Sequence, residues 1–226
     1  MPIAQAQTLY EKKYPNGNIC ARYYYDDNHN RTGKWSFYYE DGTLRKEVEY
    51  KNNTLNGKYI EYENDTIICS ANYVNGKQHG AFIRYWYYDK NIPYIKGNFE
   101  NGVMSGEWYF YDRNGGITGN YIDNKREGIW VKRHSNGNKI VEITYKNDKA
   151  FGPFTSYHYS NPNQIAETGA INGSFYDGLC STYDKTGNLI SQEDYSGKNK
   201  TCNITNLFDK ELSRVTWSIL PASYSK

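Results

Sequence analysis

A glycine that recurs about once in every 24 residues constrains this 226-residue chain more than any other feature. It closes a turn that follows an aromatic residue, as in the stretch YVNGKQHGAF from Tyr73 to Phe82. Successive copies are separated by 24, 23, 26, 22, 24 and 26 residues, and their glycines are Gly33, Gly57, Gly80, Gly106, Gly128, Gly152 and Gly178. Self-similarity at such a period indicates a repeat protein and overrides any local interpretation of a single stretch.

A large apolar side chain stands two places after each of these glycines. The residues in this position are Trp35, Tyr59, Phe82, Trp108, Trp130, Phe154 and, as the one non-aromatic member, Cys180. In the copy from Gly33 to Tyr50, aromatic residues alternate with other side chains at the period of a β-strand. Asp41-Gly42 then predicts a hairpin with a type I′ turn, and a second alternating strand follows. Each copy is therefore expected to be a β-hairpin with its second-place residue in the core.

The repeat predicts an all-β fold, an elongated antiparallel meander of about seven hairpins and about fourteen short strands. Stacked neighbours must supply the stability, because an isolated hairpin is marginal in water. We expect an N-terminal lead-in over residues 1–13, a repeat domain over 14–195 and a C-terminal cap or tail over 196–226. In the cap, Asp209 is expected to begin a short helix that covers the open edge of the last strand. An unstructured partner-binding tail is the alternative.

The repeat unit resembles the MORN repeat, in the bacterial variant of YwqK-type antitoxin-like proteins. The residues that carry the resemblance are Tyr73, Asn75, Gly76, Lys77, His79, Gly80 and Phe82, and the copy at Phe99–Trp108 is similar. The fifth copy lacks the turn glycine, and the sixth lacks the leading aromatic residue. The resemblance implies a hairpin-repeat fold and a role as a scaffold, a lipid-contacting segment or an antitoxin-like protein.

The residues that carry catalytic or metal chemistry do not form any recognised pattern. The four histidines fall in different copies, and the chain contains no Cys-x-x-Cys pair. Net charge is +2 with a pI near 8.1, well short of the basic footprint of a nucleic-acid-binding domain. No stretch approaches the 18 apolar residues of a membrane span. We therefore expect no enzyme activity, cofactor, metal or nucleic-acid partner.

The cysteines and the first residues bear on the compartment. Cys20 and Cys69 are not expected to pair, whereas Cys180 and Cys202 could form a bridge that pins the tail; a buried thiol at Cys180 is the favoured interpretation. The start MPIAQAQTLYEKKYPNG has no apolar segment typical of a signal peptide. We therefore expect a cytoplasmic protein, or an exported one if a signal peptide was removed before residue 1.

Two copies break the repeat, and they are the candidates for partner binding. The third and sixth intervals are the two 26-residue ones, and the extra length is expected at the hairpin tips. Insertions in repeat proteins collect on one face and often bind, and aromatic residues dominate binding hot spots. The predicted partner-binding residues are Trp86, Tyr87, Tyr88, Tyr94, His158 and Tyr159. Neutral loop insertions are the alternative.

Two functions remain open at the level of the sequence. The first is a non-catalytic scaffold that binds one protein partner, with antitoxin-like or immunity-like neutralisation as the role that the resemblance implies. The second is a peripheral module that binds membrane-lipid headgroups. For the second, the basic group Lys125-Arg126 and Lys132-Arg133 could touch an anionic surface, although four charges over nine residues are ordinary on a sheet.

Overall fold

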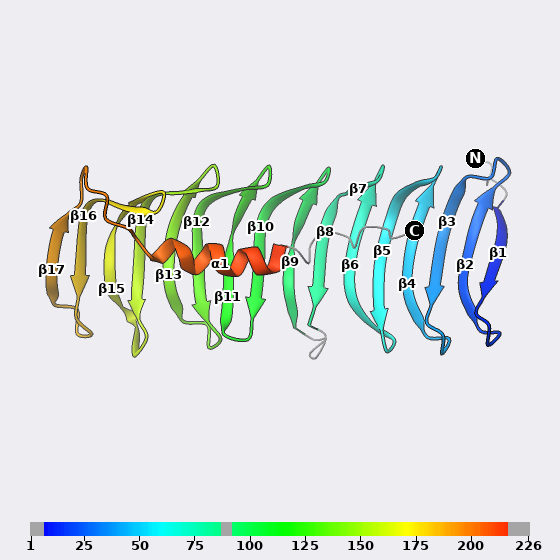
Figure 1. Ribbon diagram of the computed structural model, residues 1–226, viewed down its shortest axis with the longest axis horizontal. Coiled ribbons are helices and arrows are strands. Elements are labelled where there is room, and N and C mark those ends of the chain that lie inside the picture. Colours follow the sequence, from blue (N-terminus) through cyan, green and yellow to red (C-terminus); the bar gives the residue numbers. More distant parts are fainter. Residues whose placement is uncertain (1–6, 87–91, 217–226) are drawn as a thin grey trace. The chain divides into compact units, whose positions relative to one another are not determined.

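The computed structural model describes residues 7–86 and 92–216, which form two compact units, Met1–Met104 and Ser105–Lys226. In each unit the strands follow one another in chain order, each antiparallel to its neighbour (Figure 1). The expected all-β meander of hairpin repeats is confirmed. The described residues hold 17 strands rather than about fourteen, partly because His79 separates two short strands and a strand precedes the first expected copy.

Unit 1 begins with a strand that lies within the expected lead-in. Its strands are β1 (Gln7–Lys13), β2 (Ile19–Asp26), β3 (Arg31–Tyr38), β4 (Leu44–Lys51), β5 (Thr54–Glu63), β6 (Thr66–Val74), β7 (Lys77–Gln78), β8 (Gly80–Tyr85) and β9 (Pro93–Glu100).

Unit 2 contains the remaining strands and the one helix among the described residues. Its elements are β10 (Val103–Asp112, which starts two residues before the boundary), β11 (Gly115–Ile122), β12 (Lys125–His134), β13 (Lys139–Lys146), β14 (Lys149–His158), β15 (Asn161–Asn172), β16 (Phe175–Tyr183), β17 (Leu189–Asp194) and α1 (Ile204–Thr216).

The expected place of the type I′ turns is wrong. At Asp41-Gly42 only the glycine has positive φ, and the Gly42 N–H donates to the carbonyl oxygen of Tyr39, as in a type I turn followed by a left-handed residue. Two consecutive positive φ values, as type I′ requires, occur instead at the turns that return to the next copy. Asn75 (φ 50°) and Gly76 (φ 79°) form one such turn. The motif NGKQHG is thus a return turn, as expected, and it supplies the tight connection.

Each return turn also ties its copy to the copy before. The Gly76 N–H donates to the carbonyl oxygen of Leu55 (2.8 Å), and the Asp148 N–H donates in the same way to Arg126 (3.0 Å). Equivalent bonds recur along both units, at Asn53, Gly102 and Gly173. A left-handed backbone turns these N–H groups out of the hairpin toward the neighbouring turn, so the turn chemistry of the repeat also joins successive copies.

In each unit the core lies on one face of the strands, which we call the aromatic face and define by the second-place residues listed above. Trp108 and Trp130 are 0% exposed, and Cys180 is 4% exposed. Gly119 lies directly beneath the indole of Trp130, where a Cβ atom would collide with the ring. The expected core role of the second place is therefore confirmed, and small cross-strand residues make room for its largest members.

The insertions of the two long copies have different structures. In the third copy the extra residues lie between β8 and β9, and residues 87–91 of this connection lie outside the described part of the chain. In the sixth copy, however, β14 and β15 are joined by the tight turn Tyr159-Ser160. The extra residues form irregularities in β15, where Tyr157 pairs with Ile165 and His158 with Asn161. The extra length therefore lies next to the tip of this hairpin, as expected, although it forms a bulge in β15 rather than a longer turn.

The C-terminal cap is a helix, but it does not lie where we expected it. Helix α1 runs across the aromatic face of unit 2 instead of covering the edge strand β17 (Figure 1). Asp209 lies inside the helix rather than at its start. The chain enters the helix at Cys202, whose carbonyl oxygen accepts a hydrogen bond from the Thr205 hydroxyl (3.2 Å). Cys180 and Cys202 are both buried free thiols, which confirms the favoured interpretation of Cys180. Cys20 and Cys69 are also free thiols, so they do not pair, as expected.

Candidate functional site

The tip of the third copy presents an aromatic pair in unit 1. The rings of Trp86 and Tyr94 lie 4.6 Å apart with an interplanar angle of 32°. The pair joins the end of β8 to the start of β9, so two of the predicted partner-binding residues are brought together. Tyr87 and Tyr88 lie outside the described residues.

The tip of the sixth copy presents a second aromatic surface in unit 2. Tyr159 is 81% exposed, yet its ring sits edge-on to His134 with centroids 4.9 Å apart. His158 is oriented by a hydrogen bond between its Nε2 and the carbonyl oxygen of Tyr183 (2.9 Å), in the next hairpin tip. The His158 side chain is therefore fixed by a contact within the protein, whereas the Tyr159 side chain projects into solvent. The two tips belong to different units.

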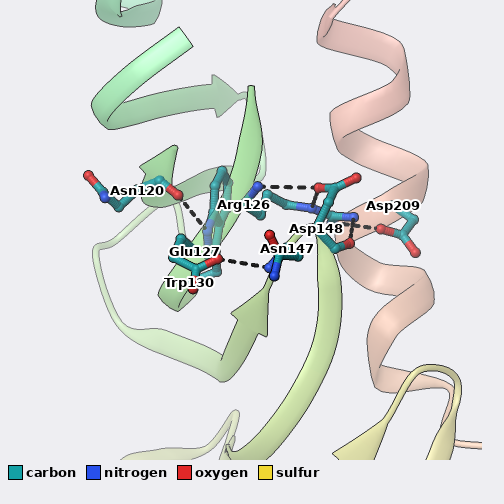
Figure 2. Close-up of polar contacts among 7 residues, drawn as sticks. All are labelled: Asn120, Arg126, Glu127, Trp130, Asn147, Asp148 and Asp209. Atoms are coloured by element: carbon teal, nitrogen blue, oxygen red, sulfur yellow. Dashed lines mark hydrogen bonds and ion pairs between the residues drawn. The ribbon is translucent and has the colours of Figure 1, made fainter. Parts of the chain in front are cut away.

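A third arrangement, which the sequence interpretation did not select, is centred on Arg126 in unit 2. Arg126 lies near the start of β12, and its guanidinium binds two carboxylates at once (Figure 2). Nε lies 2.6 Å from Oδ1 of Asp148, in the turn before β14, and Nη1 lies 2.7 Å from Oδ1 of Asp209 in α1. Nη2 donates to the carbonyl oxygen of Asp148 (3.2 Å). Arg126 thereby connects the sheet to the helix.

The surroundings of Arg126 are aromatic and largely closed to water. The guanidinium carbon lies 4.1 Å from the ring centre of Tyr145, and the Arg126 side chain is only 12% exposed. Burial alone would lower the pKa of Arg126, but Tyr145, Asp148 and Asp209 together raise it, so the charge persists. Burial raises the pKa of Tyr145 as well. A buried cation of this kind depends on its acidic partners, because removing one leaves an uncompensated charge.

Helix α1 completes the arrangement from above the sheet. Phe208 is 0% exposed and packs 6.1 Å from the ring of Tyr145, and Leu212 is 6% exposed. At the same helix, Lys132 Nζ donates to the carbonyl oxygen of Leu207 (3.3 Å). The aromatic face of unit 2 therefore holds an amphipathic helix through one buried ring and two cations.

A signal for Arg126 was present in the repeat. Arg126 stands two residues before Gly128, and Tyr145 stands 17 residues after it. Arg31 and Tyr50 occupy the same places around Gly33, so aligning the copies on their glycines would have paired them. The sequence interpretation grouped Arg126 only with its basic neighbours, and that grouping hid the repeated position.

Two further observations concern the described part of the chain. In residues 7–86 and 92–216, no group of three or more His, Cys, Asp or Glu side chains is placed to hold a metal ion. Over the same residues, no helix has the length and apolar character needed to cross a membrane.

Comparison with known proteins adds the family of the repeat. The family model described as the MORN repeat variant matches residues 31–52, 126–147 and 176–196. The first two matches begin at Arg31 and Arg126, and the third begins at Tyr176, whose ring stacks on Tyr195 at 5.2 Å. A comparison with curated proteins found no significant match. Together with the hairpin meander, these matches show that the chain carries repeats of the MORN variant family at three places.

Proposed function

We propose that this chain is a non-catalytic scaffold that binds a protein partner through its hairpin tips. Repeats of this family are generally involved in protein or membrane-lipid binding and are typically non-catalytic. The observation that carries the proposal is Tyr159, which is 81% exposed but held edge-on against His134. A large aromatic side chain that is already ordered in water loses little entropy on binding, which is why such residues dominate hot spots.

The tip of unit 1 supports the same function. The rings of Trp86 and Tyr94 contact one another at a tilted angle at the end of the hairpin, so they offer a preformed aromatic surface. Tyr87, Tyr88 and His158 remain part of the proposed binding set, the first two as residues of the same insertion and His158 as the residue that positions the tip beside Tyr159.

Lipid binding has less support, because most of its expected basic group is engaged inside unit 2. Arg126 is ion-paired with two carboxylates, and Lys132 donates to the helix. Arg133 Nη1 donates to the carbonyl oxygen of Gly137 (3.0 Å), at its own hairpin tip. Headgroup binding would need these cations to face the membrane. Because their contacts lie within the chain, headgroup binding has less support than protein binding.

A finer proposal concerns the role of the complex. The resemblance to YwqK-type antitoxin-like proteins suggests that the partner is a toxin-like protein that this chain neutralises by stoichiometric binding. A one-to-one complex that abolishes the partner's toxicity would support this role, and a partner with no toxicity of its own would contradict it.

Site-specific photo-crosslinking tests the binding surface directly. Benzoylphenylalanine is placed at Tyr159 and, as the matched control, at Tyr111, an exposed tyrosine on β10. We expect one predominant cross-linked protein from position 159, and none from position 111, when the variants are irradiated in their native cells. Tyr159→Ala should then weaken the purified complex at least about tenfold, the loss of a hot-spot residue. Undiminished binding by Tyr159→Ala would contradict the proposed surface.

The lipid alternative is tested with the same protein. Vesicles of anionic and of neutral phospholipid are floated with the chain at low and at high salt. Salt-sensitive flotation with the anionic vesicles alone would favour headgroup binding, because screening weakens exposed charge contacts. We expect the chain to remain unbound.

A further inference from the structure

The Arg126 arrangement of unit 2 occurs a second time, in unit 1. Arg31 lies at the start of β3, with its guanidinium carbon 4.7 Å from the ring centre of Tyr50. Its backbone N–H donates to Oδ1 of Asn53 (2.8 Å), and its Nη2 donates to the carbonyl oxygen of Asn53 (3.1 Å). Arg126, Tyr145 and Asp148 make the same three kinds of contact in unit 2.

The aromatic support of the two arginines is also duplicated. Trp35 Nε1 donates to the carbonyl oxygen of Tyr24 (3.1 Å), as Trp130 Nε1 donates to that of Asn120 (3.3 Å; Figure 2). Trp35 and Tyr50 meet edge to face at 5.2 Å, and Trp130 and Tyr145 do so at 6.1 Å. Each unit thus carries a cation over the ring of a tyrosine that itself meets a tryptophan edge to face.

The two copies differ in what neutralises the cation. Asn53 stands in unit 1 where Asp148 stands in unit 2, and no carboxylate among the described residues pairs with Arg31. Asp26, which ends the neighbouring strand, accepts hydrogen bonds from the backbone N–H groups of Asn28 and Asn30. Both sites therefore hold a cation, but only the Arg126 cation is paired with two carboxylates, those of Asp148 and Asp209.

The copies also differ in exposure. Trp35 is 9% exposed and Trp130 is 0% exposed, while Tyr50 is 7% exposed and Tyr145 is 2% exposed. Beyond Trp35 the aromatic face of unit 1 continues through Tyr23, 4.9 Å away, to Tyr10, which is 40% exposed. A part-open aromatic surface thus adjoins the cation.

We propose that the aromatic face of unit 1 at Arg31 binds an acidic amphipathic helix of a partner protein. The occupant is defined by α1, which shows what such a site accepts: a buried ring against the tyrosine and an adjacent carboxylate on the arginine. Since Arg31 lacks the acid that Arg126 finds in Asp148, the partner helix supplies that charge. A charge-assisted contact to a guanidinium is about twice as strong as a neutral hydrogen bond.

A second copy of α1 is a weaker occupant than a partner helix. The helix of each chain is tethered to its own unit 2, and tethering gives it an effective concentration in the millimolar range there. In α1 the acidic Asp209 is followed by the basic Lys210. The charge of Lys210 would be repelled by Arg31, whose charge is not neutralised by a carboxylate among the described residues. This inference does not rest on the tips, because the Arg31 site lies on the sheet face.

The test uses a synthetic peptide of residues 203–216 as the helix probe, with a Lys210→Glu version as the more acidic probe. Both are titrated into the full chain while the indole N–H signals of the tryptophans are followed by NMR. We expect the Trp35 signal to shift and saturate at one peptide per chain, with the acidic probe binding several-fold more tightly. Arg31→Gln should weaken binding at least about tenfold, the loss of one charge-assisted contact. The matched control Arg45→Gln, at an exposed arginine, should not weaken it.

An Asp209→Asn change in the peptide keeps the test valid if Arg31→Gln disturbs the sheet. It should weaken binding as much as Arg31→Gln does, and the two changes together should cost less than their sum. The proposal is overturned if Trp35 does not shift, if Arg45→Gln weakens binding equally, or if the Trp130 signal shifts instead. Concentration-dependent dimers of the full chain that Arg31→Gln abolishes would also overturn it, in favour of a second copy as occupant. Tyr159→Ala should leave peptide binding unchanged, which separates this site from the tips.

Discussion

Replacing Phe208 by alanine should release helix α1 from unit 2 without unfolding the sheet. Phe208 is 0% exposed and is the largest of the described side chains that α1 buries; Thr205 (3%) and Leu212 (6%) are buried along the same helix face. The strands beneath are held by their own ladders of backbone hydrogen bonds, which do not involve α1. The expected effect is therefore local.

The magnitude follows from the burial. Removing a buried phenylalanine ring costs about 3–5 kcal/mol when the cavity cannot collapse. The lower value applies here, since α1 packs on one side only and can settle toward the sheet. At about 1.4 kcal/mol for each factor of ten, about 3 kcal/mol raises the population of the undocked helix by roughly 100-fold.

Hydrogen exchange followed by mass spectrometry measures that population, because amide exchange tracks the open form when reclosing is fast. Amides of α1 should exchange roughly 100-fold faster in Phe208→Ala, and those of β12 and β13 should be unchanged. The matched control is Leu207→Ala at the preceding, 42% exposed position, where a surface change should alter exchange only about two- to threefold. Equal effects at the two positions would refute the reasoning, as would faster exchange across the sheet.

Two further predictions concern the repeats. Trp108→Ala should lower the free energy of unfolding by about 3–5 kcal/mol because the ring is fully buried, while Tyr159→Ala at an 81% exposed tip should change it little; equal losses in chemical denaturation would mean that the core face is wrongly assigned. Hydrogen bonds from Asn188 and Thr186 lower the pKa of Asp184, so its stabilising effect on the turn is complete above the usual carboxyl pKa of about 3.9 and is lost as pH falls through the folded-state value. Asp184→Asn should therefore lose less stability between neutral pH and pH ~2 than the wild-type chain does, as measured by urea midpoints; an identical acid loss would contradict this cause.

The sequence predicted the hairpin repeat well because its signals are local. The glycines after the return turns, such as Gly128 (φ 72°), need a left-handed backbone, and the second-place residues alternate with polar neighbours. The prediction failed where distant parts of the chain meet. Nothing near Asp209 in the sequence indicates that its partner is Arg126, 83 residues away. The sequence therefore predicted that the helix covers the strand edge and that Asp209 caps its N-terminus.

The return-turn hydrogen bonds have a consequence for how the protein folds and where it frays. In these turns a backbone N–H group donates to the copy before, as Gly173 does to Ala150. Contacts of this range keep the contact order low for an all-β chain, so assembly can begin at any interior hairpin and spread in both directions. A hairpin at the end of such an array has a neighbour on one side only. Strands β1 and β17, whose residues are exposed throughout, are then the first to open, and whole interior copies can be added or lost in evolution without changing the register of the rest.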